Sequence, residues 1–125
     1  MRTGELAGLT IVFAAPDGPL LASEQAALDL MGETYGSDCD MLVVPVARLP
    51  DAFFRLSTGL AGAVMQKFSN YGLRVGFVGD ISAHLGRSAP LRDFVGETNR
   101  HGHIVFAKNE TELAALLSRR GGGVH

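Results

Sequence analysis

The sequence lacks the features that mark several large classes of protein. Its single cysteine, Cys39, excludes an internal disulfide framework and any multi-cysteine zinc site. No apolar run reaches the roughly 18 residues that a membrane-spanning helix needs. Charge is not concentrated either: the formal net charge is −2 at pH 7, and no basic stripe of the kind found in nucleic-acid-binding modules occurs. We therefore expect a cytoplasmic domain that binds neither membranes nor nucleic acid.

What remains is typical of one ordinary globular domain. The chain has 125 residues, of which 46% are hydrophobic and 19% charged. A chain of this length buries roughly two-thirds of its unfolded surface and needs no metal to hold its core. We expect a single domain over residues 1–118 and a flexible, glycine-rich tail over residues 119–125.

Apolar, β-branched runs alternate with segments of helical spacing. We expect strands at residues 9–14, 41–46, 73–78 and 103–107, with residues 2–6 pairing as a hairpin onto the first. Helices are predicted from Ser23 to a stop at Gly36, over 57–71, from Pro90 to Gly102, and after a capping box at residues 109–112. Short strand–helix–strand links predict an α/β layered domain with a mainly parallel sheet of four to five strands and an antiparallel hairpin. Ligands of such sheets meet the loops at the strand carboxyl ends, here 47–58, 80–89 and 108–111.

The segment with the most suggestive chemistry is 57–62, at the predicted start of the second helix. Ser57 and Thr58 supply hydroxyls there, and Gly59 and Gly62 lie in the first turn. A hydroxyl at a helix start either caps the helix or, when phosphorylated, places a dianion where unpaired N–H groups favour it. Each glycine costs roughly 1 kcal/mol against alanine. Close packing within the chain, or the close approach of another molecule, would explain them.

Other polar residues are weaker candidates for a ligand site. Solvation or local capping is the simpler explanation for each of them. The four histidines do not have metal-ligand spacing, and no phosphate-binding loop or catalytic motif occurs, so we expect no metal and no cofactor and assign no catalytic residue. The ligand candidates are Gln66, Lys67 and Asn70 on the second helix, Asp80 after a strand, and Arg92, Glu97 and Asn99 on the third helix.

Several of these residues carry a family resemblance. The residues that carry it include Phe53-Phe54, Thr58-Gly59-Leu60-Ala61-Gly62, Gln66-Lys67-Phe68, Asn70-Tyr71, Val78-Gly79-Asp80 and Asn99-Arg100. Over about residues 28–117 the chain resembles the bacterial family catalogued as domain of unknown function 4180. The resemblance implies a fold and a bacterial source but no activity.

A second resemblance concerns the 57–62 segment. Leu56-Ser57-Thr58-Gly59-Leu60 is similar to the Asp-Ser-Ser-Gly-Leu signature of STAS domains in anti-sigma-factor antagonists. A partner kinase phosphorylates the first serine of that signature, which implies a phosphorylation site at Ser57 here. Leu56 stands in the place of the signature aspartate.

Three hypotheses for function follow. We favour a non-enzymatic regulatory module that binds a protein partner through the 57–62 segment, with Ser57 as a phospho-switch, because no catalytic constellation is present. The second is a small-molecule-binding domain or enzyme with its site around Thr58, Asp80 and Glu97; a buried acid with a raised pKa would support it and full exposure would oppose it. The third is a homodimer through an apolar rim, marked by an exposed member of Phe53, Phe54 and Phe68.

Overall fold

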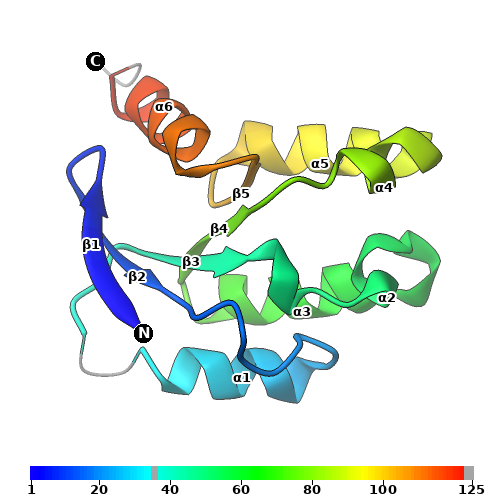
Figure 1. Ribbon diagram of the computed structural model, residues 1–125, viewed down its shortest axis with the longest axis horizontal. Helices are drawn as coiled ribbons and strands as arrows, with labels where there is room; N and C mark the ends of the chain where they lie inside the picture. The colour runs from blue at the N-terminus through cyan, green and yellow to red at the C-terminus, as the bar shows by residue number, and fades with distance from the viewer. Residues whose placement is uncertain (35–36, 123–125) are drawn as a thin grey trace.

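The computed structural model describes residues 1–34 and 37–122, and it is an α/β domain with helices on both faces of one sheet (Figure 1). The hairpin, the alternation of strands and helices and the mainly parallel sheet are confirmed. The elements in chain order are β1 (Arg2–Leu6), β2 (Leu9–Phe13), α1 (Glu24–Gly32), β3 (Met41–Pro45), the 3₁₀ turn η1 (Val46–Arg48), α2 (Asp51–Phe54), the 3₁₀ turn η2 (Leu56–Thr58), α3 (Leu60–Asn70), β4 (Arg74–Val78), α4 (Ser82–Arg87), α5 (Ala89–His101), β5 (Ile104–Ala107) and α6 (Glu110–Gly122).

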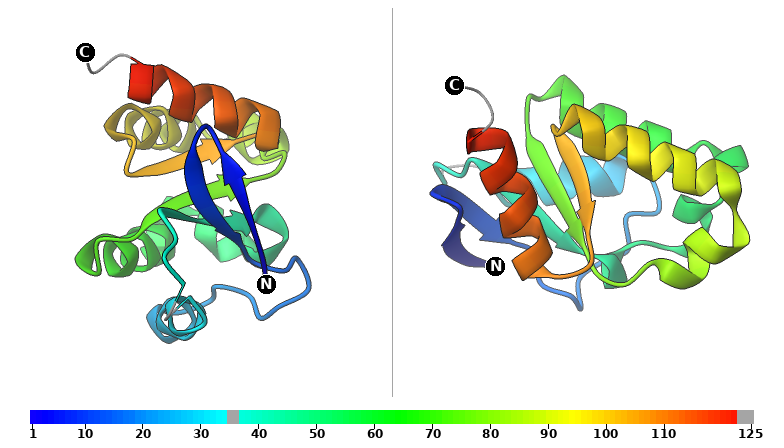
Figure 2. Two further views of the ribbon diagram at one scale, coloured as in Figure 1. Left: turned by 90° about the vertical axis from the view of Figure 1, so that its left-hand side faces the viewer. Right: turned by 90° about the horizontal axis from the view of Figure 1, so that it is seen from above.

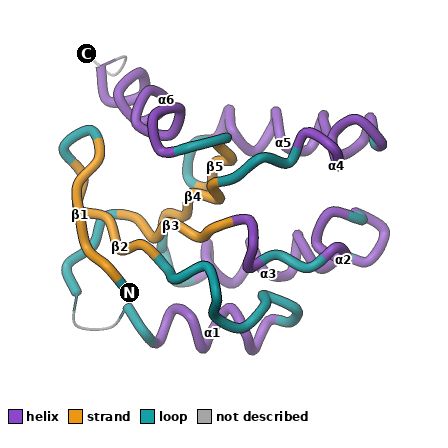
Figure 3. Tube along the Cα trace, viewed as in Figure 1, coloured by secondary structure: helices purple, strands orange, loops and turns teal. Residues whose placement is uncertain are grey.

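The five strands lie in the order β1-β2-β3-β4-β5, with β1 antiparallel to β2 and the others parallel. Each parallel strand therefore lies beside the next one along the chain (Figure 3). Because the connecting helices return the chain to the starting edge, the carboxyl ends of β2, β3 and β4 all face the same end of the molecule. That end holds α2 and α4, on the right in Figure 1.

Side chains alternate between two cores along each strand, as period-two geometry requires. On one face, Val12, Leu42 and Phe77 pack with α1, α2, α3 and α5. On the other face, Met41 and Val43 pack with α6, the red helix that crosses near the β1–β2 hairpin in the right-hand view of Figure 2.

Gly76 lets α6 approach the sheet closely. A Cβ atom built on this strand residue would lie 3.3 Å from both methyl carbons of Leu113 on α6. A side chain at position 76 would therefore require the buried Leu113 side chain to give way by a few tenths of an ångström, so glycine suits this tightly packed contact between α6 and the sheet.

Several predicted boundaries differ from the structure. Residues 51–54 and 82–87 form short helices, where the sequence predicted loops. A helix of one or two turns shows too little periodicity to be recognised from the sequence. The helix predicted from Ser57 begins at Leu60, since Gly59 adopts the left-handed φ of 75° and interrupts the chain there. The first helix ends at Gly32 rather than at Gly36, which lies outside the described residues.

The C-terminal helix is longer than expected. It includes residues 119–122 of the segment predicted to be a tail, and residues 123–125 lie outside the described part. Its start is capped by the amide of Asn109, whose Oδ1 accepts from the Glu112 N–H at 2.8 Å. Glu112 reaches back to the N–H of Lys108, one residue before the donor that a capping box would give.

The aromatic rim expected for a dimer is not on the surface. Phe53 and Phe54 are 1% and 6% exposed, and Phe68 is fully buried. The one-turn helix α2 directs both adjacent rings inward, where Phe53 contacts Phe77 edge to face with ring centroids 5.4 Å apart. These three residues therefore build the core and form no exposed apolar rim.

Candidate functional site

The 57–62 segment lies beyond the carboxyl end of β3. The chain leaves β3, forms η1, α2 and η2 in succession, and enters α3 at Leu60. Ser57 lies within η2 and is exposed, and its hydroxyl makes no hydrogen bond to any described residue. It is thus open to a partner or a modifying enzyme.

Thr58 has a structural role that distinguishes it from Ser57. Its hydroxyl oxygen lies 2.7 Å from the carbonyl oxygen of Ala52 and 2.8 Å from that of Arg55, and it accepts from the Leu60 N–H at 3.2 Å. The Thr58 side chain therefore closes η2 onto α2 and caps the first N–H of α3.

The two glycines of the segment, Gly59 and Gly62, need different explanations. Gly59 has a left-handed backbone, which favours glycine. Gly62 has no such need, because it lies in the first turn of α3 and nothing lies within 4 Å of a Cβ atom built on it. Packing within the chain does not explain Gly62, and the surface beside it is open.

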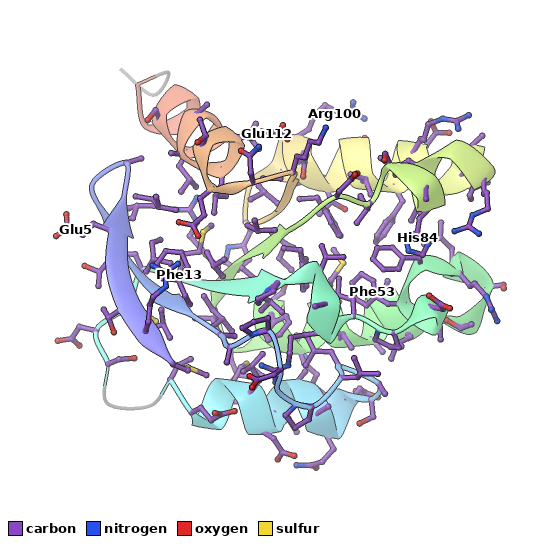
Figure 4. The ribbon with its side chains drawn as sticks, viewed as in Figure 1. Glu5, Phe13, Phe53, His84, Arg100 and Glu112 are labelled. Atoms are coloured by element: carbon purple, nitrogen blue, oxygen red, sulfur yellow. The ribbon has the colours of Figure 1, made fainter. Side chains whose placement is uncertain are left out.

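A cavity of about 540 Å³ opens beside Ser57, between α2 and α4. We call it the α2–α4 cavity. Its wall includes the ring of His84, which stacks on Phe54 with the ring centroids 4.0 Å apart and an angle of 13° between the planes. Figure 4 places His84 between these two helices. The cavity is lined by Asp51, Phe54, Arg55, Leu56, Ser57, His84, Arg87, Ser88 and Pro90.

The three polar candidates on α3 lie away from Ser57, toward the other end of the helix. Gln66 Nε2 donates to Asn70 Oδ1 at 2.7 Å on an exposed face. Lys67 forms an ion pair at 3.5 Å with Glu24 of α1, because α1 and α3 pack side by side. None of these three lines the α2–α4 cavity.

Asp80 and Asn99 meet at a second, smaller cavity of about 310 Å³ at the ends of β4 and β5, together with Lys108 and Glu112. Asp80 is exposed, and hydrogen bonds from Ser82 hold the pKa of its carboxyl group below the usual value, with the nearby Lys108 charge acting in the same direction. An acid of this kind stays ionised at neutral pH and is poorly suited to donating a proton.

Asn99 completes the free edge of the sheet at β5. The carbonyl oxygens of His103 and Ala107 accept from β4, so the polar groups of Phe106 face away from β4. The Asn99 amide pairs with both of them: its Nδ2 donates to the Phe106 carbonyl at 3.0 Å, and its Oδ1 accepts from the Phe106 N–H at 2.7 Å. The side chain thereby takes the place of a neighbouring strand.

The remaining candidates on α5 lie elsewhere. Glu97 is exposed near the end of α5 that leads into β5, and its bond and ion pair with Arg100, helped by His101, lower the pKa of its carboxyl group. Arg92 donates to the Leu85 carbonyl at 2.7 Å and holds α4 against α5. Glu97 therefore joins neither Thr58 nor Asp80, and the acids around which the second hypothesis was built are both exposed with lowered pKa values.

Arg48 is a structural residue that the sequence pattern did not reveal. It is 4% exposed and donates to the carbonyl oxygens of Pro19 (2.6 Å) and Ala15 (2.9 Å), which anchors the loop after β2. A Cβ atom on Gly18 would lie 2.4 Å from its guanidinium carbon, so this glycine lets the loop cover it. The nearby turn residues Pro16, Gly18 and Pro19 were the only available signal.

His84 and Arg87 are two of the lining residues that were not among the sequence candidates. They follow β4, whereas Arg55 and Ser57 follow β3, and only the pairing of these neighbouring strands brings the two groups together. Among the described residues, no group of three His, Cys, Asp or Glu side chains is placed to hold a metal ion. No helix in the described part of the chain has the length and apolar character to cross a membrane.

Comparison of the sequence with known protein families identifies a match. Residues 6–117 match the family described as "Domain of unknown function (DUF4180)", and the chain belongs to it. No curated protein and no solved structure matches the chain.

Proposed function

We propose that this protein is a non-enzymatic regulatory module that binds a protein partner through the 57–62 segment and is switched by phosphorylation of Ser57. The observation that carries the proposal is the contrast between two adjacent hydroxyls. The Thr58 hydroxyl donates to and accepts from backbone groups of the loop, whereas the exposed Ser57 hydroxyl bonds to no described residue. Ser57 can therefore be modified without breaking an internal contact.

Gly62 supports a partner surface next to this hydroxyl. A glycine inside an exposed helical turn costs about 0.5–1 kcal/mol against alanine and gives nothing back through internal packing here. The close approach of another backbone is a reason for it. The similarity of residues 56–60 to the STAS signature points the same way, and a STAS-like fold in a bacterial cytoplasmic protein is part of the proposal.

Phosphorylation would act through charge. A phosphate adds between −1.5 and −2 charges at neutral pH. The cavity wall beside Ser57 carries two arginines and one aspartate, so the modification would reverse the sign of the local charge. A partner matched to one state would be repelled or left with unpaired charges in the other.

The proposal is tested by partner capture with surface variants. Gly62→Ala adds only a methyl group, whereas Gly62→Arg adds a bulky side chain to a helical position where no internal atom is in the way. We expect a partner from the host that binds wild type and Gly62→Ala but not Gly62→Arg. Ser57→Ala should retain the same partner and Ser57→Asp should lose it. An identical set of captured proteins for all five chains would contradict the proposal.

The captured partner can be a second copy of the chain or a different protein. Sedimentation of the purified protein at tens of micromolar separates the two. A homodimer that dissociates on Gly62→Arg would identify self-association through this segment, and a monomer in both chains would assign the segment to a different protein.

A small-molecule site remains the alternative, and the cavity that holds Asp80 and Asn99 favours it. The exposure and lowered pKa of Asp80 weigh against acid–base catalysis, so binding is the stronger form of this alternative. A library of small metabolites screened by thermal shift against wild type and Asp80→Asn would detect it, as a stabilisation that the variant loses.

A further inference from the structure

The α2–α4 cavity contains two arginines that lack acidic partners. Arg55 and Arg87 both line it, and neither forms an ion pair within the described residues. Arg87 donates only through Nε, to the Ala83 carbonyl at 3.2 Å, and Arg55 makes no side-chain hydrogen bond to a described residue. Most of the donors on two guanidinium groups are thus available to a ligand.

The rest of the cavity wall suits an anion. Ser57 contributes a hydroxyl, and Ser88 lies where the 13-residue helix α5 begins. Ser88 Oγ accepts from the Leu91 N–H at 3.2 Å, which leaves its own proton available to a ligand. The wall contains one acidic residue, Asp51, and two arginines. The positive end of the α5 helix dipole adds further positive potential there.

We propose that the α2–α4 cavity is a receptor for one doubly charged phosphoryl group, held between Arg55 and Arg87. Guanidinium groups bind phosphate oxygens through paired, charge-assisted hydrogen bonds, and here one arginine from the connection after β3 and one from the connection after β4 line the same cavity. Such a ligand would also tie α2, after β3, to α4, after β4.

Two sources can supply this group. One is phosphorylated Ser57 itself, whose hydroxyl already lies in the cavity wall; this version rests on the proposed function. The other is a free phosphate monoester, which needs no modification of the chain. The chemistry of the receptor is the same in both cases.

Inorganic phosphate is the probe for the receptor. We would titrate it into the unmodified full chain, against chloride at matched ionic strength, and follow the His84 ring resonances by NMR. The expected result is a saturable shift with phosphate only. Arg55→Gln and Arg87→Gln should each weaken binding by about tenfold, as the loss of a charged hydrogen bond does. Arg100→Gln removes the same charge from the far end of α5 and should leave the affinity unchanged.

A shift that does not saturate, or equal effects of the three arginine variants, would overturn the receptor. Circular dichroism verifies that each variant is folded, and Arg87→Lys, which keeps the charge but not the paired donors, should retain part of the affinity.

Protein phosphorylated at Ser57 distinguishes the sources. If the internal source is correct, its His84 resonances already lie at the phosphate-bound position, and added phosphate moves them no further. Saturable phosphate binding by a chain that is never modified in its host would uphold the receptor with a free ligand and refute the Ser57 switch. If the His84 resonances of the phosphorylated chain are unchanged by Arg55→Gln and by Arg87→Gln, the switch is upheld and the receptor is refuted.

Discussion

Asn99 closes the free edge of β5, and its replacement tests how much the fold depends on that closure. The amide forms two hydrogen bonds with the backbone of Phe106, which is 5% exposed. Each such bond contributes about 0.5–1.5 kcal/mol net, so Asn99→Ala should lower the free energy of unfolding by about 1–3 kcal/mol. Alanine is the better helix former, by about 0.5 kcal/mol, and this gain masks part of the loss.

Asn70→Ala is the matched control. It exchanges the same residue types on α3, where the amide bonds only to the exposed Gln66 side chain, a contact worth a few tenths of a kcal/mol. Comparing the two variants by urea unfolding cancels most of the difference in helix propensity between asparagine and alanine. The difference between them should be about 1–3 kcal/mol. A difference below about 0.5 kcal/mol would refute the view that this amide replaces a neighbouring strand.

Asn99→Asp adds a test that depends on pH. The introduced carboxylate still accepts from the Phe106 N–H but faces the Phe106 carbonyl without a donor. Partial burial and the nearby Asp80 and Glu112 carboxylates should raise its pKa above the unfolded value, while Lys108 opposes the rise. Protonation of the introduced carboxyl group then restores a donor to the Phe106 carbonyl. The stabilisation that this hydrogen bond gives the variant is therefore fully present below the unfolded pKa and is lost as the pH rises through the folded pKa. A defect that stays constant from acid to neutral pH would contradict this assignment.

Further predictions follow from single residues. Arg48→Met should lower the free energy of unfolding by about 3 kcal/mol in urea, because two charged hydrogen bonds from a buried guanidinium group to loop carbonyls are lost. An unchanged midpoint would refute the anchoring role. Ser82→Ala should raise the pKa of Asp80 toward its ordinary value in an NMR titration. Because the pKa of Asp80 is lowered in the folded protein, its contribution to stability is present above the unfolded pKa and is lost as the pH falls through the folded pKa. In the Asp80→Asn variant, the free energy of unfolding should therefore fall less steeply as the pH is lowered. Gly59→Ala should destabilise by about 1–2 kcal/mol through its left-handed backbone, whereas Gly62→Ala should stabilise by about 0.5–1 kcal/mol; effects of the same sign would show that the two positions are misread.

The sequence was most informative where one local pattern decides the structure. Strands such as residues 41–45 are buried on both faces, so their apolar runs identified them, and Ser23 and Asn109 marked helix starts that their side chains do cap. Short helices were missed because one or two turns carry too little periodicity. The break at Gly59 was missed because a capping threonine and a left-handed glycine read like an ordinary helix start.

The candidate site depended on contacts that no local pattern encodes. Lys67 is engaged by Glu24 because α1 packs beside α3, which took it out of any Ser57 site. Asn99 looked like a ligand residue, yet its amide is committed to a strand edge that exists only in the folded sheet. Conversely, Arg87 gained interest only when the pairing of β3 with β4 placed it in the same cavity wall as Arg55 and Ser57.

The central claim is that Ser57 is the residue through which this module is switched. Intact-mass analysis with peptide mapping of the protein purified from its own host measures this directly. We predict a phosphate-sized mass gain that maps to Ser57 and leaves the neighbouring Thr58 unmodified, because the Thr58 hydroxyl is already hydrogen-bonded to the backbone of the loop. A chain that remains unmodified across growth conditions, or carries phosphate only at other residues, would contradict the account.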